Sequence, residues 1–297
     1  MKSLSPINPK PLDFSVLTLK QLAKRGLAQT ALFIFLFLTF FHLSAFAKDG
    51  SITVDAELII AVDVSWSMDP EEQFLQRQGY IDALRSPQVL AAIQRGPYGK
   101  IAITYVEWAG YKAQHIVVPW MLIDGANAVE HFVQILQSRP AQRLRRTSIS
   151  GAIDFTSKLF SGNGFAGTRQ IIDISGDGAN NDGRPVNVAR DEALAADIVI
   201  NGLPIILDRP NNFYRDVERL DHYYEDCVIG GPGAFMVPIT SREQFTDATK
   251  TKLILEIAGY SPYVFAQSHL NIRPVSSDKP RISCLEGERI WNQRWGN

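Results

Sequence analysis

Residues 57–67 read ELIIAVDVSWS. After Glu57 the segment runs through five consecutive apolar residues without polar interruption, and it stops at Asp63. A short, continuous apolar run is typical of a strand that is buried on both faces, as in the centre of a parallel sheet. We therefore predict a central strand here, followed by a turn that carries Asp63, Ser65 and Ser67.

Strands and helices alternate along the rest of the chain. Apolar runs predict further strands at residues 100–107, 115–120, 170–174, 198–207 and 234–238. Helical periodicity predicts a helical stretch from about Phe74 to the Gly96-Pro97 pair, then helices at 126–137, 148–160, 186–196, 213–224 and 243–257, with a glycine-rich loop at 161–167. The strands at 100–107 and 115–120 are close enough to pair as a hairpin. The alternation predicts an α/β fold, a Rossmann-like doubly wound, mostly parallel sheet with helices on both faces.

The first 47 residues differ in kind from the rest. A basic start precedes an apolar run at residues 31–41 and the sequence AFA at 45–47. This pattern is typical of a signal peptide, here with cleavage after Ala47, and it predicts a periplasmic or secreted protein. The run is shorter than the roughly 20 residues of a membrane-spanning helix, but counted on to Ala47 it leaves an uncleaved membrane anchor as the alternative. The remaining chain is divided into a main domain at 48–259 and a C-terminal tail at 260–297, to which no structure is assigned.

The composition argues against nucleic-acid binding. Residues 48–297 carry 25 Lys and Arg against 30 Asp and Glu, a formal charge of −5, and no basic run. Phosphate binding needs a concentrated patch of Lys and Arg. The chain has two cysteines, Cys227 and Cys284. In an oxidising compartment they could form a disulfide, or they could be two separate buried thiols; two such distant cysteines do not make a zinc site.

The turn after the first predicted strand carries oxygen ligands. In an open α/β sheet, ligands bind beyond the carboxyl ends of the strands, where the topology changes direction. Asp63, Ser65 and Ser67 lie at such an end, and their alternation could point all three inward. Carboxylates and hydroxyls suit Mg²⁺, Mn²⁺ or Ca²⁺. The plainer interpretation is a turn in which Asp63 and Ser65 cap the next helix.

Two later motifs favour the metal site. Thr147 opens TSISGAI (147–153), and Asp177 lies in IIDISGDG (171–178). Together with DVSWS (63–67), these motifs resemble the metal-ion-dependent adhesion site of von Willebrand factor A domains. The resemblance to the domain covers about residues 58–257. Gly176 stands where the family usually has Thr, and Ser150 where it often has Gly. Residues 201–205 and 230–235 resemble a bacterial branch of uncharacterised exported A-domain proteins.

The resemblance implies a ligand set and a function. Asp63, Ser65, Ser67, Thr147 and Asp177 would hold a divalent cation, Mg²⁺ before Mn²⁺ or Ca²⁺, with one position open for an acidic residue of a protein partner. The two carboxylates would offset the ion's charge. The resemblance thus implies a protein-binding module and no catalytic residues, with the membrane as a partner only if the N-terminal segment is retained.

An enzyme is the alternative. GDGANND (176–182) is similar to the GDGxxND element of haloacid dehalogenase-type, Mg²⁺-dependent phosphotransferases, which place a nucleophilic Asp after the first strand, as Asp63 is placed. Those enzymes use a second Asp two positions later as general acid, and here that position is Ser65. No GxSxG elbow supports a serine hydrolase, and residues 230–233 lack the ending of a phosphate loop.

Four residues near the predicted site remain ambiguous. Trp66 could be an exposed anchor for a partner, but we expect it to pack under the loop. Arg143, Arg145 and Arg146 could attract an acidic ligand, but a solvated loop is the plainer expectation.

Overall fold

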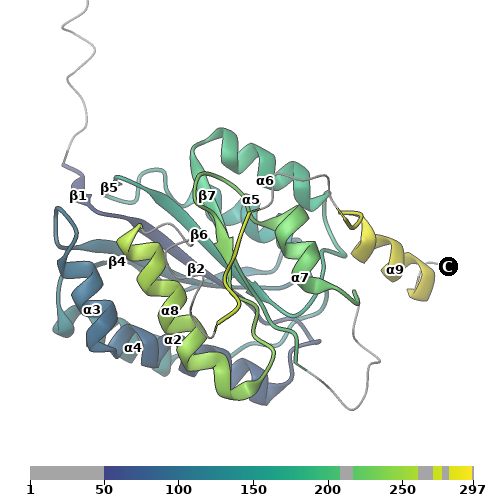
Figure 1. Ribbon diagram of the computed structural model, residues 1–297, viewed down its shortest axis with the longest axis horizontal. Coiled ribbons are helices and arrows are strands. Elements are labelled where there is room, and N and C mark those ends of the chain that lie inside the picture. Colours follow the sequence, from purple (N-terminus) through teal and green to yellow (C-terminus); the bar gives the residue numbers. More distant parts are fainter. Residues whose placement is uncertain (1–49, 208–216, 260–269, 276–280, 296–297) are drawn as a thin grey trace, which may run out of the picture. The chain divides into compact units, whose positions relative to one another are not determined.

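The computed structural model describes residues 50–207, 217–259, 270–275 and 281–295. Most of the described strands form one sheet, with all neighbours parallel except the two strands at its edges (Figure 1). Its spatial order is β4 (Gln114–Ile123), β3 (Ile101–Trp108), β2 (Glu57–Asp63), β6 (Gln170–Gly176), β7 (Ile198–Pro204), β8 (Phe235–Met236) and β9 (Arg273–Pro274). The predicted fold class, doubly wound and mostly parallel, is confirmed.

Strand β2 is an interior strand of this sheet. All seven of its residues are buried, and it pairs in parallel with β3 on one side and β6 on the other. Leu58, Ile60 and Val62 pack on one face, while Ile59 and Ala61 pack on the opposite face. Full burial of each large aliphatic side chain contributes about 1.5–3 kcal/mol, which explains why the run has no polar face.

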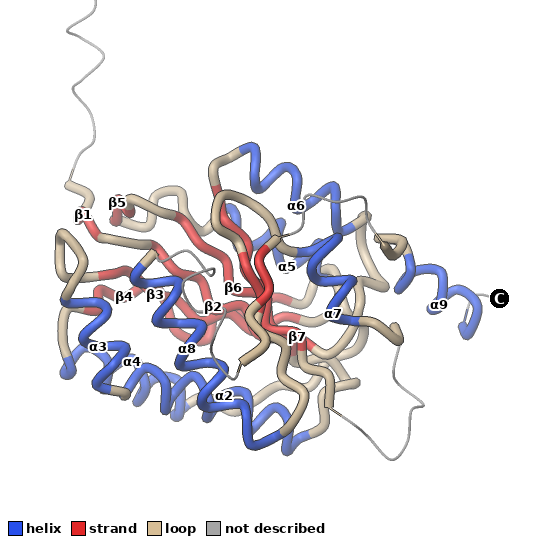
Figure 2. The backbone as a smooth tube through the Cα atoms, viewed as in Figure 1, coloured by secondary structure: helices blue, strands red, loops and turns tan. Residues whose placement is uncertain are grey.

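Helices cover both faces of the sheet (Figure 2). One face packs against α2 (Pro70–Arg85), α3 (Pro87–Gln94), α4 (Ala126–Ser138) and α8 (Phe245–Ala258). The other packs against α5 (Ile149–Lys158), α6 (Val186–Ala195), α7 (Leu220–Tyr223) and the π-helical turn η3 (Tyr224–Val228). A 3₁₀ turn, η4 (Arg242–Gln244), leads into α8. In the described part of the chain, no helix is both long enough and apolar enough to cross a membrane.

The long predicted helix before Gly96 is in fact two helices. Ser86 ends α2 and caps α3, because its hydroxyl accepts a hydrogen bond from the backbone N–H of Val89 (3.2 Å) and Pro87 occupies the first turn. Phe74, at the start of the predicted helical stretch, is 63% exposed. The helix predicted at 126–137 is α4, and four apolar residues that lie on one face of it by helical spacing are all buried: Val129, Phe132, Val133 and Leu136.

Three segments contain structure that the sequence did not predict. Residues 161–167, expected to be a loop, include β5 (Phe165–Gly167), which pairs in parallel with β1 (Ile52–Val54). The helix expected at 213–224 begins within the described residues only at Leu220 and continues as the π-turn η3. The tail contributes β9 and a final helix, α9 (Glu286–Trp295).

Cys227 and Cys284 form a disulfide, which ties the tail to η3. On the chain-entropy account, closing a loop with a sequence separation of 57 stabilises the fold by about 4 kcal/mol. The predicted signal peptide, residues 1–47, lies outside the described residues.

Candidate metal site

The carboxyl ends of β2 and β6 form the point where the sheet topology reverses. The chain passes from β2 to β3 on one side and later returns to β6 on the other side of β2. Asp63 is the last residue of β2, and Asp177 directly follows β6. Because these strands are adjacent and parallel, both carboxylates emerge at the same end of the strands, in the crevice where open α/β sheets bind ligands.

Hydrogen bonds join four of the five predicted ligands in a row. The backbone N–H of Ser65 donates to Asp63 Oδ1 (2.7 Å), and the Ser65 and Ser67 hydroxyl oxygens lie 2.9 Å apart. Ser67 Oγ then donates to Asp177 Oδ1 (2.6 Å). Asp63 and Ser65 are buried, while Ser67 and Asp177 are half-buried. The row therefore runs from the sheet edge towards solvent.

The fifth residue, Thr147, is held next to this row through its backbone. It is buried, and it precedes Ser148, the N-cap of α5. Its N–H donates to Asn181 Oδ1 (3.0 Å), and the Asn181 N–H donates to the Thr147 carbonyl (2.8 Å). Three residues earlier, the Leu144 N–H donates to the Val64 carbonyl (2.9 Å). The segment before Thr147 thus lies alongside the loop that carries Ser65 and Ser67.

The electrostatics of Asp63 are those of a carboxylate without a counterion. Burial first, and then the charge of Asp177, raise the pKa of Asp63 well above its ordinary value, although hydrogen bonds from Ser65 oppose this shift. Its Oδ2 is buried without a hydrogen-bond partner, and no basic side chain among the described residues forms an ion pair with it. A buried, unpartnered carboxylate oxygen is unfavourable by several kcal/mol unless a cation approaches it.

The donor chemistry of the row fits a hard divalent cation. In the described part of the chain, no three His, Cys, Asp or Glu side chains are grouped as a metal site would require. An ion here would therefore depend on the hydroxyls of Ser65, Ser67 and Thr147 as well as on two carboxylates. Such an all-oxygen set suits Mg²⁺, Mn²⁺ or Ca²⁺.

Gly176 is required by the close packing around Asp63. A Cβ on Gly176 would lie 2.8 Å from Asp63 Oδ2, 3.0 Å from Asp63 Cβ and 3.1 Å from the Tyr224 hydroxyl. That hydroxyl is buried without a hydrogen-bond partner in the described structure, and burial, followed by Asp63 and Asp177, raises the pKa of Tyr224. Tyr224 therefore fills the space that a threonine side chain would need, and this accounts for the glycine.

The segment after Asp177 ties the loops of the site together. Asn180 Oδ1 accepts a hydrogen bond from the Ser150 N–H (2.9 Å), and Asp182 Oδ2 accepts one from the Tyr111 N–H (2.8 Å). Asn181 binds Thr147, as described above. Sequence reasoning linked these polar residues to a phosphotransferase motif and missed this role. The signal was a run of three amide and carboxylate side chains that begins four residues after the end of β6.

Trp66 does not pack under the loop, so that expectation was wrong. Its side chain is 48% exposed, and its indole N–H donates to the Arg143 carbonyl (3.3 Å). The guanidinium of Arg143 donates to the carbonyls of Trp66 (2.8 Å) and Met68 (3.1 Å). Arg145 stacks on the indole with its guanidinium carbon 4.4 Å from the ring centroid. The expected solvated loop is therefore an organised one, although its arginines are exposed.

The C-terminal tail also reaches this region. Asn180 Nδ2 donates to Glu288 Oε1 (2.7 Å), and the Arg146 guanidinium carbon lies 3.7 Å above the ring centroid of Trp291. The tail helix α9 therefore contacts both segments that flank Thr147 and Asp177.

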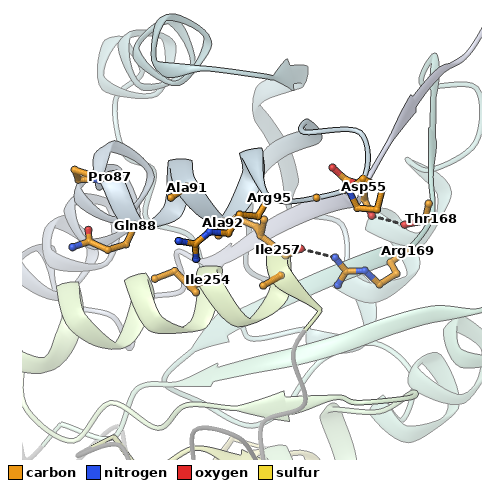
Figure 3. A pocket seen from close by; sticks show the side chains of 13 residues that line it. Asp55, Pro87, Gln88, Ala91, Ala92, Arg95, Thr168, Arg169, Ile254 and Ile257 are labelled. Atoms are coloured by element: carbon orange, nitrogen blue, oxygen red, sulfur yellow. Dashed lines mark hydrogen bonds between the residues drawn. The ribbon is translucent and has the colours of Figure 1, made fainter.

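A cavity of about 480 Å³ lies at the other end of the sheet (Figure 3). It is lined by α3, α8 and the segments that precede β2 and β6, where Arg169 donates to the carbonyls of Glu256 and Ile257. Because Asp55 and Arg169 come before their strands and Asp63 and Asp177 come at the ends, this cavity is separate from the candidate metal site.

Comparisons with solved structures find the same fold. Proximal thread matrix protein 1 (PTMP1) from the mussel byssus aligns with 70% of this chain and 49% of its own, at 15% identity and a TM-score of 0.51. A further structure of it is described as having a zinc-occupied MIDAS motif, the metal-ion-dependent adhesion site. The pilus adhesin SpaC from Lactobacillus rhamnosus GG aligns with 69% of this chain and 31% of its own, at 10% identity and a TM-score of 0.52. This chain thus spans about half or less of either protein, and the likeness is one of fold.

No curated protein matches the chain. A family described as "Protein of unknown function (DUF1194)" matches residues 53–261, which include the whole of the candidate metal site. The chain has a fold of the von Willebrand factor A type, and it belongs to this uncharacterised family.

Proposed function

We propose that the protein is an exported module that binds a protein partner through a divalent cation, Mg²⁺ before Mn²⁺ or Ca²⁺. Asp63, Ser65, Ser67, Thr147 and Asp177 would hold the ion. The observation that carries the proposal is the buried Asp63 carboxylate, whose Oδ2 has no partner within the described structure. Its Oδ1 accepts from the Ser65 N–H, and the Ser65 and Ser67 hydroxyls continue the row to Asp177.

The charge of the site favours binding over catalysis. Two carboxylates offset the +2 charge of the ion, so an acidic side chain of a partner can join the ion without a large local excess of either charge. Ser65 stands where a phosphotransferase would need its general acid, and the polar residues after Asp177 hold loops together. We therefore propose that the protein is not an enzyme.

Similarity in fold to two proteins supports a role in adhesion. SpaC is a pilus adhesin, and PTMP1 is a matrix protein with a zinc-occupied site of the type proposed for this chain. Both share the fold at 10–15% identity. The ion and the partner of this chain are our proposal.

Export is part of the proposal, because a basic start, an apolar run and the AFA sequence precede the folded chain. N-terminal sequencing of the protein recovered from its native cell should begin at Lys48. An intact Met1 on a protein of the cytoplasm would overturn this part.

Calorimetric titration of Mg²⁺ and Mn²⁺ tests the site. We expect one ion per wild-type chain and a loss of affinity of at least about 100-fold in Asp63→Ala, because a charge-balancing ligand is removed. The matched control is Asp124→Ala. It removes an exposed carboxylate after β4, which lies near the start of β3 and so at the opposite end of the parallel strands from Asp63. Undiminished binding by Asp63→Ala, or no binding by the wild type, would show that residues 63–67 form only a capped turn.

Capture and turnover assays separate binding from catalysis. In a cell-envelope extract, wild-type protein should retain a partner in Mg²⁺ and release it in EDTA, and Asp63→Ala should retain none. The wild type with Mg²⁺ should not hydrolyse a generic phosphate ester. Hydrolysis that is lost in Asp63→Ala would favour the phosphotransferase alternative.

A further inference from the structure

An aromatic residue and an arginine lie side by side next to the candidate metal site. Ser65 and Leu144 form a parallel β-bridge, so the residues that follow them, Trp66 and Arg145, emerge together. Trp66 lies between the proposed ligands Ser65 and Ser67, and Arg145 lies two residues before Thr147. Since consecutive Cα atoms are about 3.8 Å apart, the Arg145 Cα is within about 7.6 Å of the Thr147 Cα.

The indole is anchored by a hydrogen bond and serves as a platform. Its N–H donates to the Arg143 carbonyl, and the Arg143 guanidinium returns a hydrogen bond to the Trp66 carbonyl, at 3.3 and 2.8 Å. Despite these bonds the indole is 48% exposed. A tryptophan that is fixed yet exposed next to a binding site has the properties of an interface hot spot, because it loses little conformational entropy on binding.

Arg145 differs from the two arginines that flank it. The guanidinium of Arg143 is used to hold the loop, and that of Arg146 packs on Trp291 and donates to the Asn181 carbonyl (3.4 Å). Arg145 is exposed and stacks on Trp66, and in the described structure its guanidinium makes no hydrogen bond or ion pair. Stacking fixes the plane of the guanidinium and leaves its N–H groups available for a planar acceptor.

We propose that Arg145, supported by Trp66, binds a second carboxylate of the partner, so that the partner is a protein segment with two acidic side chains. One carboxylate would complete the coordination of the ion, and the other would accept paired hydrogen bonds from Arg145. This inference rests on the proposed function, because the ion supplies the first anchor. The two carboxylates of the site balance the ion, so the first acidic residue of the partner brings the site to a charge of −1, and Arg145 offsets the charge of the second.

Selection from a displayed library of random 12-residue peptides tests this inference. Immobilised wild-type protein in Mg²⁺ should enrich peptides with two acidic residues a few positions apart, whereas Arg145→Gln should enrich peptides with one. Arg95→Gln, at an exposed arginine beside the distant cavity, is the matched control and should select as the wild type does. Calorimetry should show that all three proteins bind Mg²⁺ alike, since Arg145 is not a proposed ligand.

A double-mutant cycle on one selected peptide assigns the two carboxylates. Amidating the Arg145-facing residue should weaken binding to the wild type by about 5- to 20-fold and should change binding to Arg145→Gln by less than about 2-fold. Arg145→Lys should recover only part of the affinity, since lysine lacks the planar fork. Amidating the other residue should abolish the dependence on Mg²⁺.

Three results would overturn the inference, and they are distinguishable. If both amidations weaken binding equally in wild type and in Arg145→Gln, Arg145 does not bind a carboxylate of the partner. The proposed metal-dependent function would still stand. Peptides that bind equally in Mg²⁺ and EDTA would contradict the proposed function, and the two-carboxylate inference with it. A wild type that binds Mg²⁺ but enriches no acidic peptide would exclude an acidic segment as the partner.

Discussion

Two pairs of carboxylates have different surroundings, although one member of each, Asp173 in β6 and Asp177 directly after it, lies only four residues from the other. Asp173 and Glu256 are buried together with Lys252, whose ammonium forms ion pairs with both. The Tyr80 hydroxyl donates to Asp173 Oδ2 (3.0 Å), and Asn201 Nδ2 donates to Glu256 Oε1 (2.9 Å). Where β6 and the neighbouring β2 end, Asp177 and Asp63 are linked through Ser67 and Ser65, and no basic side chain of the described residues pairs with Asp63.

The difference separates a structural cluster from a binding site. Buried charges persist in proteins when a partner of opposite charge and hydrogen bonds accompany them. The inner pair, Asp173 and Glu256, has such a partner in Lys252, and the three side chains join α8 to β6. The outer pair, Asp63 and Asp177, lies at the end of the strands where ligands can enter. Among the described residues no basic side chain pairs with Asp63. A cation from solvent can take the place there that Lys252 takes in the core.

Removing the internal cation should have the largest effect on stability. Lys252→Met leaves Asp173 and Glu256 buried without an ammonium, which should lower the free energy of unfolding by about 3–5 kcal/mol in urea titrations. Lys250→Met, on the same helix, is the control: Lys250 pairs with the exposed Asp247, so the loss should be below about 1 kcal/mol. A loss below 1 kcal/mol in Lys252→Met as well would mean that the inner pair is not held by its lysine.

The inner pair should also make stability depend on pH. Burial, followed by the charge of Asp173, raises the pKa of Glu256 from 4.5 to about 7, although Lys252 opposes this shift. A carboxyl group whose pKa is raised by folding stabilises the protein below its unfolded pKa, and this contribution is lost as the pH rises through the folded pKa. Wild-type stability should therefore lose up to about 3 kcal/mol from this group between pH 4.5 and 8.

Glu256→Gln isolates that contribution, because it removes the titrating group and keeps an acceptor for Lys252 and Asn201. The stability of the variant relative to wild type should rise by up to about 3 kcal/mol from pH 4.5 to 8. Glu71→Gln, at an exposed position of α2, should show no such trend. Parallel pH profiles for wild type and Glu256→Gln would contradict the assignment.

The sequence predicted the outer pair better than the inner one. Asp63 and Asp177 stand where apolar runs end, and a strand end is visible in a sequence. Asp173 interrupts an apolar run that was rightly predicted as a strand, but its partner Lys252 lies 79 positions away in a helix, and no local pattern connects them. The pairing depends on which face of α8 meets β6, which only the packed structure fixes.

The same limit explains the other misses. Trp66 and Arg145 are exposed together because of one β-bridge between segments that are far apart in sequence. The brief strands β1 and β5 and the tail strand β9 have two or three residues each, too few to show a period of two. The helix α9 is predominantly polar, and its position depends on the disulfide and on contacts with Asn180 and Arg146.

The smallest expected effect tests the outer pair directly, because its sign should reverse with metal. Asp63→Asn keeps the size of the side chain and an acceptor for the Ser65 N–H but removes a charge that burial and Asp177 disfavour. In EDTA at pH 8, we expect the variant to be more stable than wild type by about 1 kcal/mol. In Mg²⁺ at 100 times the wild-type Kd, the wild type should gain about 2.7 kcal/mol and the variant almost nothing, so the order of stability inverts. Asp124→Asn should follow the wild type in both buffers. If Asp63→Asn is less stable than wild type without metal and the difference does not change with Mg²⁺, the outer carboxylates serve the fold as the inner ones do.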